Sequence, residues 1–243
     1  MLAFNQSGCI DHPPLLFLHG ILGAKEDWEQ VISLLENAFH CIAIDLPGHG
    51  ISPFSLPLEE TVAEVLDHLQ IQKCGLIGYS LGGRLALNLK RANTKRFPRP
   101  VLISTNPGIA VHEKKQRKQT DQDWAEKLDT LSIKDFLALW YAQPVFRSLH
   151  QRPDLLIQII ERRSQVRKEE VSYFLSHFSV ADQQIYYPDD ALFLCGKEDL
   201  KYADLYRTLP LPVESAEIEG AGHVLHLENP EACAFKIRSW FIT

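Results

Sequence analysis

Residues 78–82, Gly78-Tyr79-Ser80-Leu81-Gly82, form a G-x-S-x-G motif, and this stretch decides the fold. Residues 73–77 before it have the pattern of a short buried strand, and residues 83–89 after it have the pattern of a helix. A serine on so sharp a strand-to-helix turn is strained and exposed, and its glycine neighbours leave room for backbone that a side chain would block. The context therefore predicts a reactive serine at Ser80, and the alternative is a serine in an ordinary glycine-rich turn.

The composition suits one globular domain with a sizeable core, because 45% of the 243 residues are hydrophobic and 23% are charged. The net charge of -6 argues against a nucleic-acid partner, although local positive charge can still serve a small anionic substrate. The chain has no His-Glu-x-x-His motif, no Walker loop and no G-x-G-x-x-G after a strand. We therefore expect neither a metal nor a cofactor.

The five cysteines are scattered, and none of them forms a Cys-x-x-Cys pair. This usage is typical of a reducing compartment. The first residues lack a basic leader with a long apolar stretch, and the apolar run at 15–18 is too short to span a bilayer. We expect a cytoplasmic protein with no membrane partner, either a monomer or a weak homo-oligomer.

Apolar strand-like runs alternate with helical patterns along the chain. The strand-like runs are 15–18, 41–44, 76–77, 101–103, 192–195 and 213–218. The helical patterns between and after them are 28–35, 58–69, 81–89 and 230–241. Alternation of this kind, with continuous apolar strands, predicts an α/β fold with a mostly parallel sheet and helices on both faces.

One interval, from about residue 106 to 188, contains no convincing strand. Its helical patterns are 121–131, 133–141, 153–164 and 168–178. Ligands bind at the carboxyl ends of the strands in open α/β sheets, so a helical insertion between two strands is a candidate lid over the site. We expect a core made of 1–105 and 189–243 with a helical lid at 106–188; the alternative is a second helical layer with no functional role.

A reactive serine at position 80 requires two partners. A histidine takes the hydroxyl proton, and a carboxylate fixes the tautomer of that histidine. In sites of this geometry the chain order is serine, acid, histidine. Asp199 lies in the loop that follows the strand-like run 192–195 and is the predicted acid. Glu198 is the fallback, and Asp204 lies further along the chain.

His223 is the predicted proton carrier. It follows the strand-like run 213–218 and a loop with two glycines, Gly220 and Gly222, which allow the chain to turn back toward the serine. His226 is the competitor, but it falls in an apolar segment that is expected to pack. Loop placement therefore favours His223.

An oxyanion hole needs two backbone donors. One comes from Leu81, which follows the serine, and the other from Ile21, in the loop after the first strand-like run. His19 in the same loop is predicted to brace it rather than to carry protons. Asp45 and His49 belong to a second glycine-containing loop and are predicted to stabilise its turn, with substrate contact as the alternative.

These motifs together resemble the α/β-hydrolase superfamily. The matching stretches are residues 18–20, 45–50, 78–83, 196–199 and 221–223, and they extend over nearly the whole chain. The resemblance implies an α/β-hydrolase fold. It does not select a reaction, because one fold supports many kinds of chemistry.

A narrower resemblance does indicate a reaction. The chain is similar to the 2-succinyl-6-hydroxy-2,4-cyclohexadiene-1-carboxylate synthases, a family of lyases in menaquinone and phylloquinone biosynthesis. Most of the matching residues lie in the insertion, where hydrolases of this fold differ most. They are Tyr79, Arg84, Pro107-Gly108, Arg117, Asp121, Trp124-Ala125, Trp140-Tyr141, Gln143-Pro144-Val145-Phe146 and Arg163-Ser164, with Arg162 as the alternate for Arg163.

The resemblance implies that pyruvate is eliminated from 2-succinyl-5-enolpyruvyl-6-hydroxy-3-cyclohexene-1-carboxylate. This substrate has three carboxylates, which the forked donors of arginine bind bidentately. Ser80, activated by His223, acts as a general base without an acyl intermediate, and the developing enolate oxygen is stabilised by the oxyanion-hole amides. The implied substrate-binding residues are Tyr79, Arg84, Arg117, Trp140 and Arg163.

The alternative function is a serine hydrolase, either a carboxylesterase or a carbon–carbon bond hydrolase, with Ser80 as nucleophile. A neutral ester does not need Arg84, Arg117 or Arg163, so these arginines discriminate between the two. A third class is a non-enzymatic receptor on the same fold. The binding residues also have purely structural interpretations, with Arg84 as a solvated helix residue, Arg117 as part of a charged surface run and Trp140 as core of the insertion.

Overall fold

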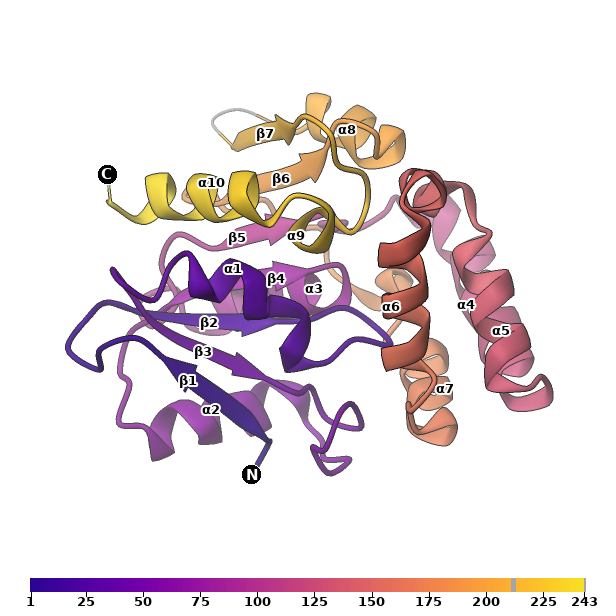
Figure 1. The fold of residues 1–243 in the computed structure, drawn as a ribbon, viewed down its shortest axis with the longest axis horizontal. Coiled ribbons are helices and arrows are strands. Elements are labelled where there is room, and N and C mark those ends of the chain that lie inside the picture. The colour runs from indigo at the N-terminus through magenta and orange to yellow at the C-terminus, as the bar shows by residue number, and fades with distance from the viewer. Residues whose placement is uncertain (211–212, 243) are drawn as a thin grey trace.

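The computed structural model describes residues 1–210 and 213–242, and a seven-stranded sheet forms its centre (Figure 1). The strands are β1 (Phe4–Ser7), β2 (Pro14–Leu18), β3 (His40–Ile44), β4 (Gly75–Tyr79), β5 (Val101–Ile103), β6 (Leu192–Gly196) and β7 (Glu214–Ile218). Their order across the sheet is β1-β3-β2-β4-β5-β6-β7. β1 pairs antiparallel with β3, and the other neighbours pair in parallel, so the predicted mostly parallel sheet is confirmed.

Helices cover both faces of the sheet, as predicted. They are α1 (Glu29–Ser33), α2 (Leu58–His68), α3 (Leu81–Ala92), α8 (Leu200–Arg207) and α10 (Pro230–Ile242), with the short helices η1 (Lys25–Trp28) and α9 (Leu225–Glu228). Successive strand side chains point to opposite faces. Leu15 and Phe17 therefore pack on the face covered by α1 and α10, whereas Leu16 and Leu18 pack on the face covered by α2, α3 and α8.

The chain between β5 and β6 is helical. It contains α4 (Val111–Thr130), α5 (Ile133–Tyr141), η2 (Pro144–Gln151), α6 (Pro153–Arg163), α7 (Lys168–His177) and η3 (Val180–Asp182). α4 packs against α7 and η3. Figure 1 shows α4 to α7 grouped at the end of the sheet toward which the parallel strands point, where the carboxyl ends of the strands lie.

The sequence patterns missed several elements, among them β1, the first half of α4 and the short helices η1, η2, η3 and α9. β1 was not predicted, because it is a four-residue edge strand with two exposed central residues and no apolar run. α4 begins at Val111, although only its second half, from residue 121, was predicted as helix. Its first turns are rich in lysine, glutamate and glutamine, which favour helix without producing an apolar stripe, and Glu113 accepts a hydrogen bond from the backbone N–H of Ala110 at the helix start (3.0 Å).

The cysteines are free thiols, and four of them, Cys41, Cys74, Cys195 and Cys233, are buried. In buried positions cysteine packs as a small hydrophobic side chain, and burial raises the pKa of each of these four thiols to about 12. Within residues 1–210 and 213–242, none of the helices has the length and apolar character needed to cross a membrane.

Candidate active site

Ser80 occupies the turn between β4 and α3 in a strained conformation, with φ 52° and ψ -109°. Residues other than glycine rarely adopt a positive φ, because the Cβ then clashes with the backbone. Backbone strain of this kind is typical of functional turns. Close backbone approach explains the flanking glycines. A Cβ on Gly82 would lie 2.2 Å from the carbonyl oxygen of Leu18, and one on Gly78 would lie 2.5 Å from the carbonyl oxygen of Gly82. The local sequence therefore holds the serine at the carboxyl end of the sheet.

Asp199 and His223 form a buried hydrogen-bonded pair. The distance from Nδ1 of the histidine to Oδ2 of the aspartate is 2.7 Å, and the residues are only 6% and 1% exposed. A carboxylate can only accept, so Nδ1–H donates and Nε2 is left able to accept a proton. The arrangement is that of a general base whose tautomer is fixed by a carboxylate.

Three aromatic rings hold the imidazole of His223 in place. Its centroid lies 5.2 Å from the ring of Tyr202, 5.5 Å from that of Phe146 and 5.5 Å from that of Tyr79. These rings come from the core and from the insertion, so both parts of the chain restrict the orientation of the imidazole. A restricted base retains productive geometry without losing entropy during each turnover.

The other candidate acids are on the surface. Glu198 is exposed, and Asp204 forms an ion pair with Arg207 at 2.8 Å while 76% of its side chain is exposed. The geometry therefore supports Asp199, which was predicted from its place after β6.

His226, the competing histidine, is fully buried and packs against Trp28 and Tyr79, with ring centroids 4.5 Å from each. Burial lowers its pKa to about 3. Both of its ring nitrogens are buried without a hydrogen-bond partner among the described residues. It is a neutral core residue and not part of the cavity lining, as its apolar segment indicated.

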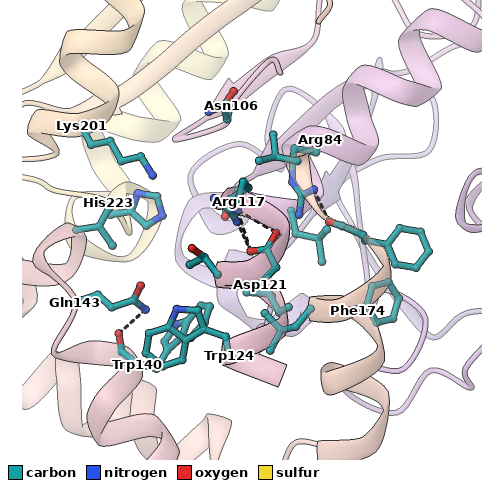
Figure 2. A pocket seen from close by; sticks show the side chains of 18 of the residues that line it. Arg84, Asn106, Arg117, Asp121, Trp124, Trp140, Gln143, Phe174, Lys201 and His223 are labelled. Carbon is teal, nitrogen blue, oxygen red and sulfur yellow. Dashed lines mark hydrogen bonds and ion pairs between the residues drawn. The ribbon is translucent and has the colours of Figure 1, made fainter. Parts of the chain in front are cut away.

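A cavity of about 230 Å³ lies beside Ser80 and His223, between the core and the insertion. Figure 2 shows cationic, aromatic and amide side chains gathered around it. The residues that line it include Ile21, Ser80, Leu81, Arg84, Asn106, Arg117, Asp121, Trp124, Trp140, Gln143, Lys201 and His223. The serine, the histidine and both predicted oxyanion-hole residues therefore face one space.

The loop that carries Ile21 is braced by His19. Nδ1 of this histidine lies 2.7 Å from the carbonyl oxygen of Gly20, and Nε2 accepts from the backbone N–H of Leu46 at 2.9 Å. These bonds require the neutral tautomer with the proton on Nδ1. Burial lowers the pKa of His19, which favours that neutral form.

Asp45 stabilises the second loop. It accepts hydrogen bonds from the backbone N–H groups of Lys25 and Ile51, at 2.8 and 3.1 Å. It also forms an ion pair with the Lys25 ammonium at 2.9 Å. His49 is likewise buried, with Nδ1 lying 3.1 Å from the carbonyl oxygen of Pro47. Neither residue lines the cavity among the described residues, which agrees with the turn-stabilising interpretation.

Arg84 lies one helical turn after Ser80, and its Nη1 donates to the backbone carbonyl of Phe178 at 2.5 Å. Burial, followed by the positive charge of Arg117, lowers its pKa to about 10. A pKa lowered in this way means that the cationic form lacks sufficient solvation and counter-charge. An anion bound in the cavity would supply that counter-charge.

Arg117 is held by Asp121, one turn further along α4. Its Nε lies 2.8 and 2.9 Å from the two carboxylate oxygens, and its Nη2 lies 2.8 Å from Oδ1. This charged run is therefore not only a solvated surface, because Arg117, Asp121 and Thr120 line the cavity. The bonds to Asp121 fix the guanidinium and leave its remaining N–H groups available.

Trp140 serves both of the roles that the sequence left open. It stacks on Phe136 at 5.7 Å, meets Trp124 edge-on at 5.0 Å, and also lines the cavity. It is therefore core of the insertion and a cavity surface at once.

Arg163 and Tyr79 are not among the described residues that line the cavity. Arg163 is buried, with Nη2 3.4 Å from Oδ2 of Asp27 and its guanidinium 5.5 Å from the ring centroid of Tyr141. The ring of Tyr79 packs closely against Gly20, and a Cβ added to this glycine would lie 2.7 Å from the tyrosine ring. In this conformation neither residue reaches the cavity, and their contact with a substrate stays a prediction.

Lys201 lines the cavity but was not singled out from the sequence. It lies in the first turn of α8, two residues after Asp199. Burial, followed by the positive charge of Arg117, lowers its pKa. Its short spacing from Asp199, the predicted acid, is a sequence signal that would have identified it.

The chain is similar in sequence to known proteins over most of its length. Residues 13–230 match the family described as the alpha/beta hydrolase fold. The 2-succinyl-6-hydroxy-2,4-cyclohexadiene-1-carboxylate synthase of Serratia proteamaculans is 33% identical, covering 98% of this chain and 96% of that protein. The putative synthase of the same name from Haemophilus influenzae is 32% identical over 93% and 96%.

Solved structures agree on the fold. MenH from S. aureus superposes with a TM-score of 0.91 at 24% identity, covering 100% of this chain and 98% of that one. A malate-bound thermophilic esterase from Thermogutta terrifontis superposes with a TM-score of 0.82 at 22% identity, over 99% and 93%. MenH and an esterase thus share this architecture, so the fold alone does not select a reaction.

Proposed function

We propose that this chain, which belongs to the α/β-hydrolase family and within it to the 2-succinyl-6-hydroxy-2,4-cyclohexadiene-1-carboxylate synthases, uses Ser80, His223 and Asp199 to eliminate pyruvate from 2-succinyl-5-enolpyruvyl-6-hydroxy-3-cyclohexene-1-carboxylate. One observation carries the proposal. The cavity beside the serine is lined by the cations Arg84 and Arg117, and the substrate carries three carboxylates.

The reaction begins with removal of a proton from the ring carbon that bears the succinyl ketone. The C–H electrons form a new ring double bond, the existing double bond moves by one position, and the bond to the enolpyruvyl oxygen breaks. Pyruvate leaves as its enolate and is then protonated, so the atoms balance. The elimination is redox-neutral and requires no electron-carrying cofactor.

The triad supplies the base. Nε2 of His223 takes the hydroxyl proton of Ser80 as the serine oxygen takes the proton from the ring carbon, and Asp199 stabilises the imidazolium that forms. No bond forms between the serine and the substrate. Negative charge develops on the ketone oxygen, where the backbone N–H groups of Ile21 and Leu81 form the oxyanion hole.

Arg84 and Arg117 bind substrate carboxylates. Arg84 enters the cavity from α3, at the floor near the serine, and Arg117 enters from α4 of the insertion. Because one arginine comes from the core and the other from the insertion, a polyanion between them would link the two parts. On this basis residues 106–188 act as a lid that closes on the substrate.

The proposed enzyme acts in the cytoplasm as a monomer or weak homo-oligomer on a small anionic substrate. The four buried free thiols support a reducing compartment. The biosynthetic relatives, which are bacterial, support the same location.

The test is to mix the purified protein with the enolpyruvyl substrate and follow pyruvate by coupling to lactate dehydrogenase. Pyruvate should appear together with the absorbance of the conjugated diene, and Ser80→Ala should lower kcat/KM by orders of magnitude at an unchanged Tm. If no pyruvate forms while nitrophenyl esters are hydrolysed rapidly, the chain is a serine hydrolase instead.

A further inference from the structure

Lys201 is the cavity cation for which the proposed function has no role. It sits on the second residue of α8, and its backbone is fixed beside the triad because Asp199 is the N-cap of the same helix. Figure 2 shows its amine end directed into the cavity next to His223, while Arg84 and Arg117 approach from the other side. A third positive charge is therefore placed where the proton is removed.

The ammonium of Lys201 differs from the other cavity cations in its partners. Arg117 is bound by the carboxylate of Asp121, and Arg84 donates to a backbone carbonyl. Within the described part of the chain, Lys201 has no ion pair or hydrogen bond, and its Nζ lies over the ring of Tyr202, 5.5 Å from the centroid. Lys201 thus has all three donors available for an anion.

The substrate has three carboxylates, and among the described residues two arginines, Arg84 and Arg117, line the cavity. Arg163, the third arginine expected from the family, is buried against Asp27 with a separation of 3.4 Å and does not line the cavity. A carboxylate left without a cation in a partly enclosed site would lose solvation without compensation. One cation position remains, and Lys201 occupies it.

We propose that Lys201 binds the ring carboxylate of the substrate, on the carbon next to the one that loses its proton. This inference rests on the proposed function. The ring carboxylate is the one adjacent to the reacting C–H, and Lys201 is the cavity cation beside His223. The enolpyruvyl group leaves from the opposite side of the ring, so its carboxylate falls toward the arginines across the cavity.

The first experiment compares Lys201→Gln and Lys201→Arg with the wild type in the pyruvate-release assay. Lys201→Gln should lower kcat/KM by about 10- to 100-fold, mostly through KM, and Lys201→Arg should recover part of the loss. Lys197→Gln is the matched control, because Lys197 lies as close to Asp199 in the sequence as Lys201 does, two residues before it. Unlike Lys201, it pairs with Glu219 at the surface. It should behave as the wild type does.

The second experiment identifies which carboxylate is bound. Calorimetry measures the Kd of an aromatic analogue with a ring carboxylate beside a succinyl chain, and of its ring carboxamide counterpart. Lys201→Gln should weaken the acid by about 10- to 100-fold and leave the amide unchanged. Equal affinities of the acid for wild type and variant would overturn the proposal, and so would equal weakening of both analogues.

The two proposals fail in different ways. If the wild type releases no pyruvate, the lyase function is wrong, whatever Lys201 does. If the wild type releases pyruvate and Lys201→Gln matches it in both kcat/KM and analogue affinity, only the role of Lys201 is wrong. Thermal unfolding of each variant shows that it is folded, and α8 should be retained because glutamine and arginine favour helix about as well as lysine does.

Discussion

Replacement of Asp199 by asparagine tests the triad most directly. Asp199→Asn preserves size and shape but removes the negative charge that accepts the 2.7 Å bond from His223 Nδ1. The other carboxylate oxygen accepts from the backbone N–H of Tyr202 at 3.4 Å. The asparagine side chain has one acceptor oxygen, so it cannot accept from both groups as the carboxylate does.

The magnitude follows from these contacts. Loss of a buried charge-assisted hydrogen bond costs about 1.5–3 kcal/mol, and a buried donor left without an acceptor costs about 1–3 kcal/mol more. If the NH₂ group faces Nδ1 of His223, the ring proton moves to Nε2, which can then no longer accept from Ser80. If the amide is reversed, its NH₂ group faces the Tyr202 N–H instead. The total of about 2.5–6 kcal/mol predicts that kcat/KM falls by about 10² to 10⁴.

The assay is pyruvate release from the enolpyruvyl substrate, with Tm measured on the same samples. Asp204→Asn is the control, because it makes the same chemical change in an exposed ion pair with Arg207. It should leave kcat/KM unchanged. If Asp199→Asn retained kcat/KM within about threefold of the wild type, the assignment of the acid would be refuted.

Three further predictions test charge, covalency and pH. Arg84→Ala should lower kcat/KM by about 10- to more than 100-fold. Arg84→Lys should lower it by less, because lysine provides the positive charge without the paired N–H donors of the guanidinium. Wild-type kinetics in the alanine variant would exclude carboxylate binding by Arg84. Nitrophenyl acetate should be hydrolysed slowly and without a burst, whereas a burst stoichiometric with enzyme would indicate an acyl-enzyme. Because burial lowers the pKa of His226 from 6.5 to about 3, the unfolded chain binds more protons between these values, and the free energy of unfolding should fall as pH decreases through this range. His226→Leu should flatten that dependence in urea denaturation, by up to about 1.4 kcal/mol per pH unit, and an unchanged slope would contradict the argument.

Local patterns in the sequence were sufficient for the sheet and the reactive loops. The apolar runs predicted six of the seven strands, and the glycines around Ser80 predicted its turn, because close backbone approach excludes any side chain there. Asp199 and His223 were predictable because each follows a strand and is close to it in sequence. These features depend on neighbours within a few residues.

The surroundings of the cavity depended on contacts between distant parts of the chain. Asp27 and Arg163 are 136 residues apart, and their ion pair holds this arginine away from the cavity lining. The pairing of Arg117 with Asp121 is local, but only the packing of the insertion over the strand ends brings it to the site.

The sequence by itself therefore determined the fold, through strand periodicity and glycine turns, and the family, through the residues that resemble it. It also predicted Ser80, Asp199 and His223 as a triad, because motif spacing is a short-range property. Only the tertiary structure decided which cations face the cavity. Arg84, Arg117 and Lys201 line it, whereas Arg163 does not. The physical reason is that a long charged side chain takes the partner that offers the best solvation or counter-charge, and that partner is fixed by packing between elements far apart in the sequence.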